Sequence, residues 1–299
     1  MKKKIKIGIP RTFYYSRKGI ICKNFFNKLG CNVILSPETN NKIIEEGEKI
    51  SEKNMCKSYQ IYLGHIKELS KKCDYIIIMI NKNYKNTCPN FTMTYDNVKE
   101  IIPPDMIIPY KISTNKFNIE ILEYIKMGTY ITPNLLKIIK SYLCSVKKQR
   151  KYNINKINYQ KHLQKKDTQK VLIMAPFYIM EEKLYLNNII NKLKENNMIP
   201  ILSNYLNLDT SLFFKEYFPC NIKWNYVNEM LEAYYYYQNE ISGVINILNP
   251  NCQISSLINS YFNMKVSTTP FISIYTNKIN ESNDKIQSFI LNVKGKKYE

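Results

Sequence analysis

Short apolar runs alternate with amphipathic segments from the start of the chain. The run KIKIGIP at residues 4–10 predicts a strand that ends near Gly8 and Pro10. In RKGIICKNFFNKLG, residues 17–30, apolar side chains recur at helical spacing before Gly30, and CNVILS at 31–36 predicts a second strand. Strand, helix and strand with short connections are typical of a right-handed crossover in a parallel sheet.

The same alternation continues along the chain. Helices are expected in NNKIIEEGEKI and in the segment that carries Gly64 and His65, and a strand in DYIIIMI, whose β-branched run Ile76–Ile78 indicates burial on both faces. A second series follows: strands in KVLIMAPFY, MIPILS, SGVINILN and TTPFISIY, with helices in LYLNNIINKLKENN, in CQISSLINSYFN and over residues 283–293.

Between these two series lies a lysine-rich stretch, from about residue 115 to 167, with a helical pattern and little strand signal. We therefore predict an α/β protein with two flavodoxin-like or Rossmann-like domains, each with a parallel sheet. The predicted boundaries are an N-terminal domain over residues 1–112, a helical connector over 113–167 and a C-terminal domain over 168–299.

Composition excludes several classes of protein. A hydrophobic fraction of 44% excludes a disordered chain, and the longest apolar run, residues 75–80, is too short to cross a bilayer. The lysine-rich start lacks the apolar core of a secretory signal, so we expect a cytoplasmic protein. A net charge of +20 raises nucleic acid as a partner. Lysine is, however, spread over the whole chain beside abundant asparagine and isoleucine, which is typical of an AT-rich genome, and we do not expect nucleic-acid binding.

Eight cysteines stand in the sequence, none of them in a CxxC pair. In open α/β sheets, functional groups collect where a strand ends and a helix begins, and Cys56, Cys88 and Cys252 hold such positions. A helix start also favours the thiolate form, so redox or metal chemistry is open to these three. The other five are expected to be small buried hydrophobes: Cys22, Cys31, Cys73, Cys144 and Cys220.

Several motifs together resemble a known family. In order, KIGIPRTFYY, FFNKLGCNVILSPETN, CKSYQIYLGHIKEL and CPNF are similar to the motifs of activase-related proteins in the 2-hydroxyacyl-CoA dehydratase superfamily, and KVLIMAPFY, NCQISSLINSYF and TPFISIY extend the resemblance over nearly the whole chain. The group of proteins that the chain resembles includes 2-hydroxyglutaryl-CoA dehydratase D-component-like proteins and the domain of unknown function 2229.

The resemblance implies an iron-sulfur protein of anaerobic metabolism. It implies that Cys56, Cys88 and, by a looser match, Cys252 hold a 4Fe-4S cluster or a larger double cubane, with Cys220 as the alternative third ligand. An ATP-hydrolysing activase would supply low-potential electrons. The chain would be either a (R)-2-hydroxyacyl-CoA dehydratase-like lyase acting on an acyl-CoA or an electron-transfer component, and a homo- or heterodimer stays open.

Two further residues have competing interpretations. His65 could donate a hydrogen bond to a cluster sulfur or move a substrate proton, but a packing histidine beside Gly64 is the favoured interpretation. Arg11 could bind an anion such as a CoA phosphate, although a structural role, either capping a helix terminus or pairing with Glu38, is favoured.

The chain departs from the family pattern at Ser58, Gln60, Thr276–Lys278, Lys285 and Gln287. Substitutions around a metal site weaken the orientation of the bound metal group even where all of its ligands remain. A divergent binding or assembly protein that has lost the cluster is therefore the alternative function.

Overall fold

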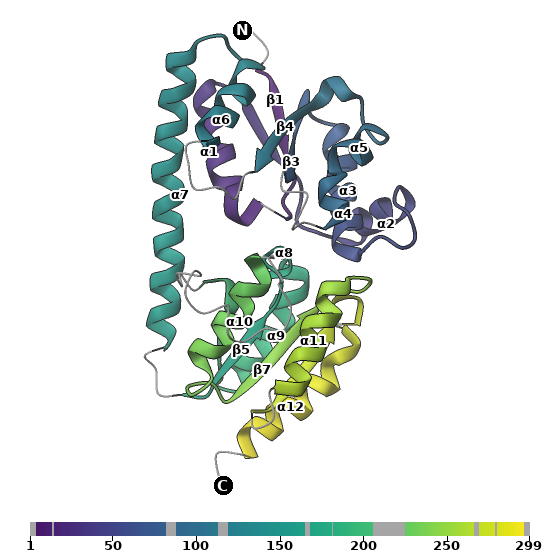
Figure 1. The fold of residues 1–299 in the computed structure, drawn as a ribbon, viewed down its shortest axis with the longest axis vertical. Coiled ribbons are helices and arrows are strands. Elements are labelled where there is room, and N and C mark those ends of the chain that lie inside the picture. Colours follow the sequence, from purple (N-terminus) through teal and green to yellow (C-terminus); the bar gives the residue numbers. More distant parts are fainter. Residues whose placement is uncertain are drawn as a thin grey trace. The chain divides into compact units, whose positions relative to one another are not determined.

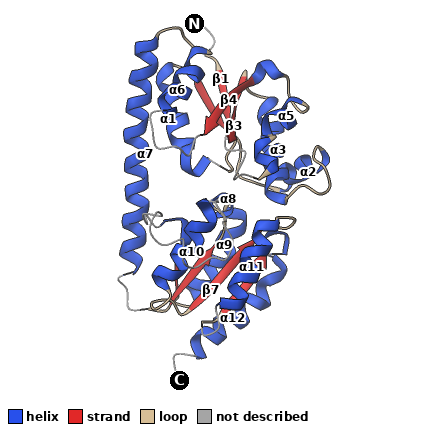
Figure 2. Ribbon diagram, viewed as in Figure 1, coloured by secondary structure: helices blue, strands red, loops and turns tan. Residues whose placement is uncertain are grey.

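The structure is a computed structural model that describes residues 4–13, 15–81, 88–112, 119–164, 168–180, 182–205, 225–265, 269–278 and 280–295. The chain divides into two compact units, the first made of Met1–Met55 and Tyr59–Asn153, the second of Cys56–Ser58 and Ile154–Glu299. Each unit is built around one parallel sheet with helices on both faces (Figures 1 and 2). Within the described ranges, no helix has the length and hydropathy needed to cross a membrane.

The first unit has the strand order β2-β1-β3-β4. Its strands are β1 (Lys6–Ile9), β2 (Asn32–Leu35), β3 (Tyr75–Asn81) and β4 (Ile107–Ile112). Its helices are α1 (Ile20–Leu29), α2 (Asn41–Lys49), α3 (Lys57–Ser70), α4 (Pro89–Thr92), α5 (Thr94–Lys99), α6 (Ile119–Thr129) and α7 (Leu135–Gln164), with short turns η1 (Tyr15–Gly19) and η3 (Pro104–Met106). In Figure 1, α1 and α6 lie on one side of this sheet and α3 and α5 on the other.

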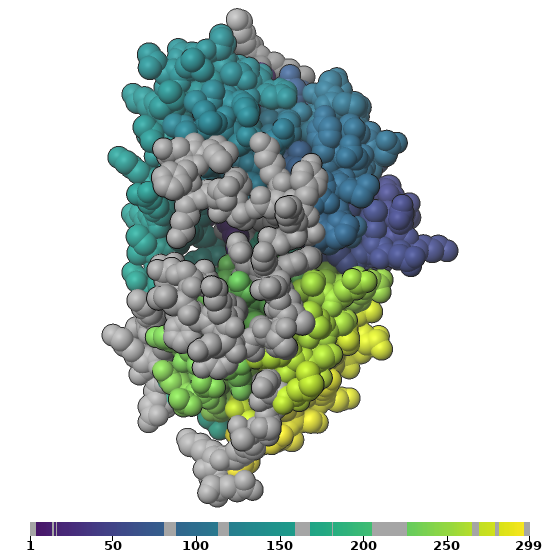
Figure 3. Space-filling view, viewed as in Figure 1, coloured from purple at the N-terminus to yellow at the C-terminus, as the bar shows by residue number. Residues whose placement is uncertain are grey.

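The second unit repeats this arrangement in the order β6-β5-β7-β8. Its strands are β5 (Lys170–Met174), β6 (Ile199–Leu202), β7 (Gly243–Leu248) and β8 (Phe271–Tyr275). Its helices are α8 (Phe177–Met180), α9 (Lys183–Glu195), α10 (Asn225–Tyr237), α11 (Gln253–Lys265) and α12 (Asn283–Gly295), with turns η4 (Ser203–Tyr205), η5 (Thr276–Lys278) and η6 (Asn280–Ser282). The outer faces of α11 and α12, yellow-green to yellow, form part of the surface of this unit (Figure 3). The predicted fold of two Rossmann-like parallel sheets is confirmed.

The lysine-rich stretch is largely helical in the structure, as α6 and α7. The buried side of α7 presents Ile138, Ser141 and Ser145, a helical spacing of three and four residues. The Nζ of Lys137 donates a hydrogen bond of 2.9 Å to the carbonyl oxygen of Leu29, at the C-terminal end of α1. The helix dipole favours a cation at this end. Because the division into units falls within α7, at residue 153, the predicted boundaries at 112 and 167 stay predictions.

Strand β4 was not predicted from the sequence, because prolines surround and interrupt it. Pro109 lies inside the strand and pairs in register with Ile78 of β3. Proline has no N–H for a ladder hydrogen bond, so it is confined to edge strands, and β4 is the edge of its sheet. An edge position thus reconciles the proline with a strand.

Helices α2 and α3 approach each other closely at two glycines. A Cβ on Gly64 would lie 2.1 Å from the carbonyl oxygen of Ile43, and a Cβ on Gly47 would lie 2.0 Å from the carbonyl oxygen of Gln60. Real Cβ atoms do not come so near to backbone oxygen atoms, so both positions require glycine. The close approach of α2 and α3 therefore depends on these two glycines.

We expect Gly64→Ala to lower the free energy of unfolding by at least about 2 kcal/mol, because the added methyl group must push α2 away from α3. Urea unfolding of the wild type and the variant measures this difference. Gly295→Ala is the matched control, since a Cβ there has no neighbour within 4 Å. In Gly295→Ala only the favourable helix propensity of alanine acts, so its stability is expected to stay the same or rise. A Gly64→Ala variant as stable as Gly295→Ala would contradict the close approach of α2 and α3.

Candidate functional site

The strand orders place a topological switch point in each sheet. Chain connections leave in opposite directions from β1 and β3 in the first unit and from β5 and β7 in the second. In open parallel sheets, ligands bind beyond the carboxyl ends of such strand pairs. The candidate site of each unit is therefore sought at that edge.

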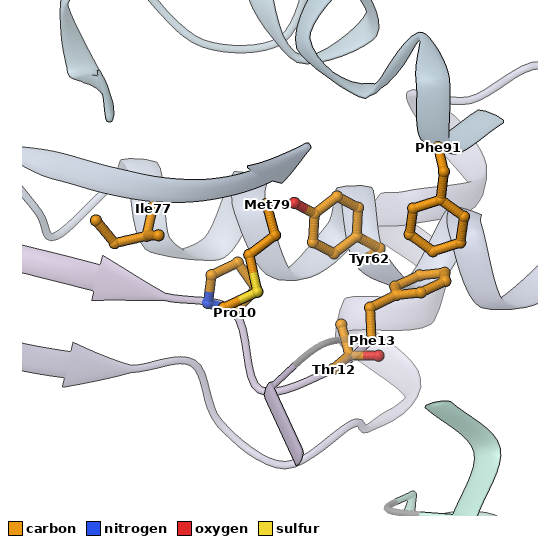
Figure 4. Close-up of a pocket in the computed structure, with 7 residues that line it drawn as sticks. All are labelled: Pro10, Thr12, Phe13, Tyr62, Ile77, Met79 and Phe91. Atoms are coloured by element: carbon orange, nitrogen blue, oxygen red, sulfur yellow. The ribbon is translucent and has the colours of Figure 1, made fainter. Parts of the chain in front are cut away.

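A small cavity lies at the switch point of the first unit. Figure 4 shows Pro10, Thr12 and Phe13 from the segment after β1, Ile77 and Met79 from β3, Tyr62 from α3 and Phe91 from α4 around it. The cavity volume is about 10 Å³, close to the least space that holds one water molecule. Its lining is mainly apolar, and its volume is too small for a substrate.

The shape of this cavity depends on Phe13. Its φ of 53° lies in the left-handed region, which is uncommon for a residue with a large side chain. The ring of Phe13 meets the rings of Phe91 and Tyr62 edge to face, at centroid distances of 4.4 and 5.2 Å. Such aromatic pairs are stabilising and oppose the cost of the strained backbone.

Tyr62 brings a polar group to the cavity. Its hydroxyl points toward Met79 (Figure 4). Burial, with a smaller effect of the neighbouring Tyr59, raises the pKa of Tyr62 above its ordinary value, and the Met79 backbone opposes this rise by a hydrogen bond. The hydroxyl therefore stays protonated near neutral pH.

Arg11 also lies at this edge, directly after β1. Its Nη1 is 3.5 Å from Oε1 of Glu38, and its backbone N–H donates to Oγ of the buried Ser36 at 2.7 Å. The ion pair is one of the two structural roles that the sequence favoured. About a third of the Arg11 side chain remains exposed, and its Nε is buried with no hydrogen-bond partner in the described residues. The anion contact stays a prediction.

His65 is fully buried on α3, close to Arg11. Its Nε2 is 3.1 Å from Oγ1 of Thr39, and its Nδ1 has no hydrogen-bond partner in the part of the chain that the structure describes. Burial first, and the charge of Arg11 second, lower the pKa of His65 to about 4. The imidazole is neutral at pH 7 and holds α3 near the segment after β2, as the packing interpretation expects.

The three candidate cysteines stand at helix starts and are partly exposed. Cys56 precedes α3, Cys88 caps α4, where its carbonyl accepts from Phe91 N at 2.9 Å, and Cys252 precedes α11, where its carbonyl accepts from Ser256 N at 3.1 Å. Cys88 belongs to the first unit and Cys252 to the second, with which residues 56–58 are also grouped. In the described residues, no group of three or more histidine, cysteine or acidic side chains could hold a metal ion.

The other described cysteines differ from these three. Cys22, Cys31 and Cys73 are buried, and burial raises the pKa of the Cys22 thiol to about 12 and of the Cys31 and Cys73 thiols to about 11. These three are packing residues, as expected. Cys144 is exposed on α7, in contrast to the expected burial. Cys220 lies outside the described residues.

In the second unit, Tyr178 of α8 stands near two of the candidate cysteines. Its pKa is raised well above the ordinary value, first by burial, then by Tyr226, Cys252 and Cys56, while the nearby Asn249 amide opposes the rise. Sequence reasoning did not identify Tyr178, nor Phe13, Tyr62 and Phe91 in the first unit. The only signal for them was their position: each follows a strand or a candidate cysteine in the chain.

Together these features define a doubly wound α/β protein of two units, with polar side chains and thiols at the carboxyl ends of its strands. A family model described as "CoA enzyme activase uncharacterised domain (DUF2229)" matches residues 6–206. The chain belongs to this family, which confirms the resemblance to activase-related proteins. The family name associates it with CoA enzymes and their activation in general terms.

Other comparisons give only distant similarities. No curated protein matches the chain. Similar solved structures include the SBP FpvC from P. aeruginosa in complex with Ni²⁺, with 11% identity, 98% of both chains covered and a TM-score of 0.33. The Zn(II)-bound AdcAII variant from Streptococcus pneumoniae has 10% identity, 98% and 97% coverage and a TM-score of 0.31. A putative phosphosugar isomerase from Bacillus subtilis has 10% identity, 98% and 85% coverage and a TM-score of 0.26. TM-scores this low support no conclusion about the present chain.

We expect the stability of the protein to fall as the pH decreases from 6.5 to 4, and His65 to cause part of this loss. The folded state keeps the imidazole neutral down to about pH 4, whereas the unfolded chain takes up the proton near pH 6.5. Between pH 6.5 and 4, the unfolded state thus binds more protons than the folded state. The contribution of His65 to the free energy of unfolding therefore falls by about 3 kcal/mol over this range.

Urea unfolding at pH 7 and at pH 4, for the wild type and His65→Gln, measures this contribution. The variant has no imidazole, so its free energy of unfolding is expected to fall less between the two pH values. Equal falls in both proteins would contradict the assigned pKa of His65.

Proposed function

We propose that this protein is an iron-sulfur protein of the 2-hydroxyacyl-CoA dehydratase type that receives low-potential electrons from an ATP-hydrolysing activase. Cys56, Cys88 and Cys252 would hold the cluster, either a 4Fe-4S cluster or a larger double cubane. The observation that carries the proposal is the contrast among the cysteines. These three are partly exposed at helix starts, whereas Cys22, Cys31 and Cys73 are buried.

The residue type and surroundings of the three cysteines fit such a group. Iron-sulfur clusters bind thiolates, and a thiol is most easily deprotonated where solvent reaches it and a helix begins. Cys56 and Cys252 directly precede helices of 14 and 13 residues. When bound, the cluster would supply one-electron transfer, and three protein ligands would leave one iron open to a substrate oxygen.

The side chains of the first unit would contribute orientation and exclusion of water. The aromatic side chains of Phe13, Tyr62 and Phe91 line the cavity beside Met79 of β3, so they limit the access of water to it. The Tyr62 hydroxyl, protonated at neutral pH, is the polar group at this cavity. Arg11, held by Glu38, would offer the exposed part of its guanidinium to an anionic group such as a CoA phosphate.

The alternative function is a binding or assembly protein without a cluster. It is motivated by the departures from the family pattern at Ser58, Gln60, Asn277 and Lys285. In this alternative, the three thiols remain as residues of the fold, and neither an activase nor an acyl-CoA is required.

Anaerobic purification followed by iron and acid-labile sulfide analysis tests the proposal. We expect about four irons per chain for a single cubane, and loss of most of this iron in Cys56→Ser, Cys88→Ser and Cys252→Ser. Cys144→Ser is the control, because Cys144 is also exposed to solvent but lies on α7. Its iron content is expected to equal that of the wild type.

No bound iron after reconstitution of the wild type would support the alternative function. Iron that persists in all three variants, or that is lost equally in Cys144→Ser, would contradict the assigned ligands.

A further inference from the structure

Helix α7 carries an excess of positive charge that its own sequence does not balance. Its 30 residues include seven lysines and one arginine, and neither aspartate nor glutamate. Lysine occurs along the whole chain, but no acidic residue stands between Glu123 and Asp167. By contrast, Lys71 and Lys72 at the end of α3 pair with Glu68. The positive charge of α7 is therefore available to a negatively charged partner.

One side of α7 is occupied by contacts with α1 and α6. The side chain of Gln149 accepts a hydrogen bond of 3.2 Å from the backbone N–H of Ile21 in α1. The ring centroids of Tyr142 and of Tyr124 in α6 lie 4.9 Å apart. In Figure 1, α7 is the outer helix on the side of the first sheet that α1 and α6 cover. Its other side therefore faces away from this sheet.

Leucines and lysines share this outer side of α7. Leu136, Lys140, Leu143, Lys147 and Lys151 succeed one another every three or four residues, so they lie on one side of the helix. All five are exposed, with 82% of Leu136 and 54% of Leu143 open to solvent. We call these five residues the α7 stripe.

The lysines of the stripe differ in their contacts from two other lysines of α7. Lys137 and Lys148 donate hydrogen bonds of 2.9 and 3.1 Å to α1. The three lysines of the stripe make no hydrogen bond or ion pair with any residue that the structure describes. Packing within the first unit explains the first two lysines but not the three in the stripe.

A partner for the stripe must accept ammonium groups and leucine side chains along one line. From Leu136 to Lys151 the helix rises about 22 Å, which is longer than a single small anion. A second copy of this helix would be repelled by its like charge. A nucleic acid offers phosphates, which bind cationic and polar side chains and leave the leucines without apolar contacts.

We propose that the α7 stripe binds to the surface of a bilayer that contains anionic phospholipids. Helices that lie in a bilayer surface place leucines at the boundary of the acyl chains, while lysines reach the headgroup phosphates. The long lysine side chain allows this, because its stem lies along apolar atoms while its ammonium stays in water. The contact is peripheral, so the buried side of α7 keeps its packing on α1 and α6.

This surface goes beyond the proposed function, because it contains none of the candidate cluster ligands. Cys56, Cys88 and Cys252 lie outside α7. Failure of one proposal therefore leaves the other intact. The Cys56→Ser variant is expected to bind vesicles as the wild type does, which separates the two.

Sedimentation of the full-length protein with vesicles tests the proposal. We expect binding to vesicles of phosphatidylcholine mixed with phosphatidylglycerol, and at least about tenfold weaker binding to phosphatidylcholine alone. Raising the salt concentration from about 0.1 M to about 1 M is expected to weaken binding to the anionic vesicles, because the Debye length shortens from about 10 Å to about 3 Å.

Two double variants connect lipid binding to the stripe. Lys140→Gln with Lys147→Gln is expected to lower the affinity for anionic vesicles about 30-fold, since each lysine near such a surface contributes about fivefold. Leu136→Ser with Leu143→Ser is expected to lower it about tenfold, because two apolar side chains no longer leave water on binding. All four side chains are exposed, so both variants are expected to keep the fold.

The control is Lys49→Gln with Lys53→Gln, two exposed lysines in α2 and directly after it. Helix α2 packs on α3, on the other side of the sheet from α1 (Figure 1). This variant loses the same charge as the lysine variant of the stripe. Its affinity for anionic vesicles is expected to stay close to that of the wild type.

The proposal is overturned if the wild type does not bind anionic vesicles, or if it binds both kinds of vesicle equally. Equal losses of affinity in the control and in the lysine variant, or wild-type affinity in the leucine variant, would also overturn it. Binding to a DNA duplex without binding to vesicles would assign the lysines to a nucleic acid instead.

Discussion

The backbone contact between α2 and α3 determines where the functional side chains of the first unit stand. Gly47 and Gly64 allow each helix to reach the carbonyl oxygens of the other, so the position of α3 has little freedom. Cys56 precedes this helix, Tyr62 reaches the cavity from it, and His65 packs from it against Thr39. Close packing at these two glycines therefore determines where Cys56, Tyr62 and His65 lie.

Much of the fold could be predicted from the sequence, because parallel strands buried on both faces leave continuous apolar runs. The strands KIKIGIP, DYIIIMI and SGVINILN were recognised in this way. Strand β4 was not, since Pro109 conceals it and only its edge position makes the proline acceptable. The ion pair of Arg11 with Glu38 was one of the two structural roles favoured from the sequence, and the structure contains it. Aromatic side chains around the cavity were not, because their meeting depends on the left-handed backbone at Phe13.

The two sheets share an order and a register but differ in how their edges are built. In the first unit, charged and hydroxyl groups at the edge bind one another, as Arg11, Glu38 and Ser36 do. In the second, the uncharged side chains of Asn246 and Thr276 are buried instead. The two sheets therefore carry different side-chain chemistry at comparable places. Repetition of a fold within a chain does not imply repetition of its chemistry.

The separation of buried from accessible thiols has a practical consequence for work in air. Oxidation attacks thiols that are accessible and readily ionised, whereas thiols with raised pKa in the interior react slowly. Oxygen would therefore modify Cys56, Cys88, Cys144 and Cys252 long before it reaches Cys22 or Cys73. A sample handled in air would keep its packed sheets and its helical signal while its candidate ligands became sulfenic or sulfinic acids. Correct folding of such a sample would say nothing about whether the protein that the cell makes binds iron.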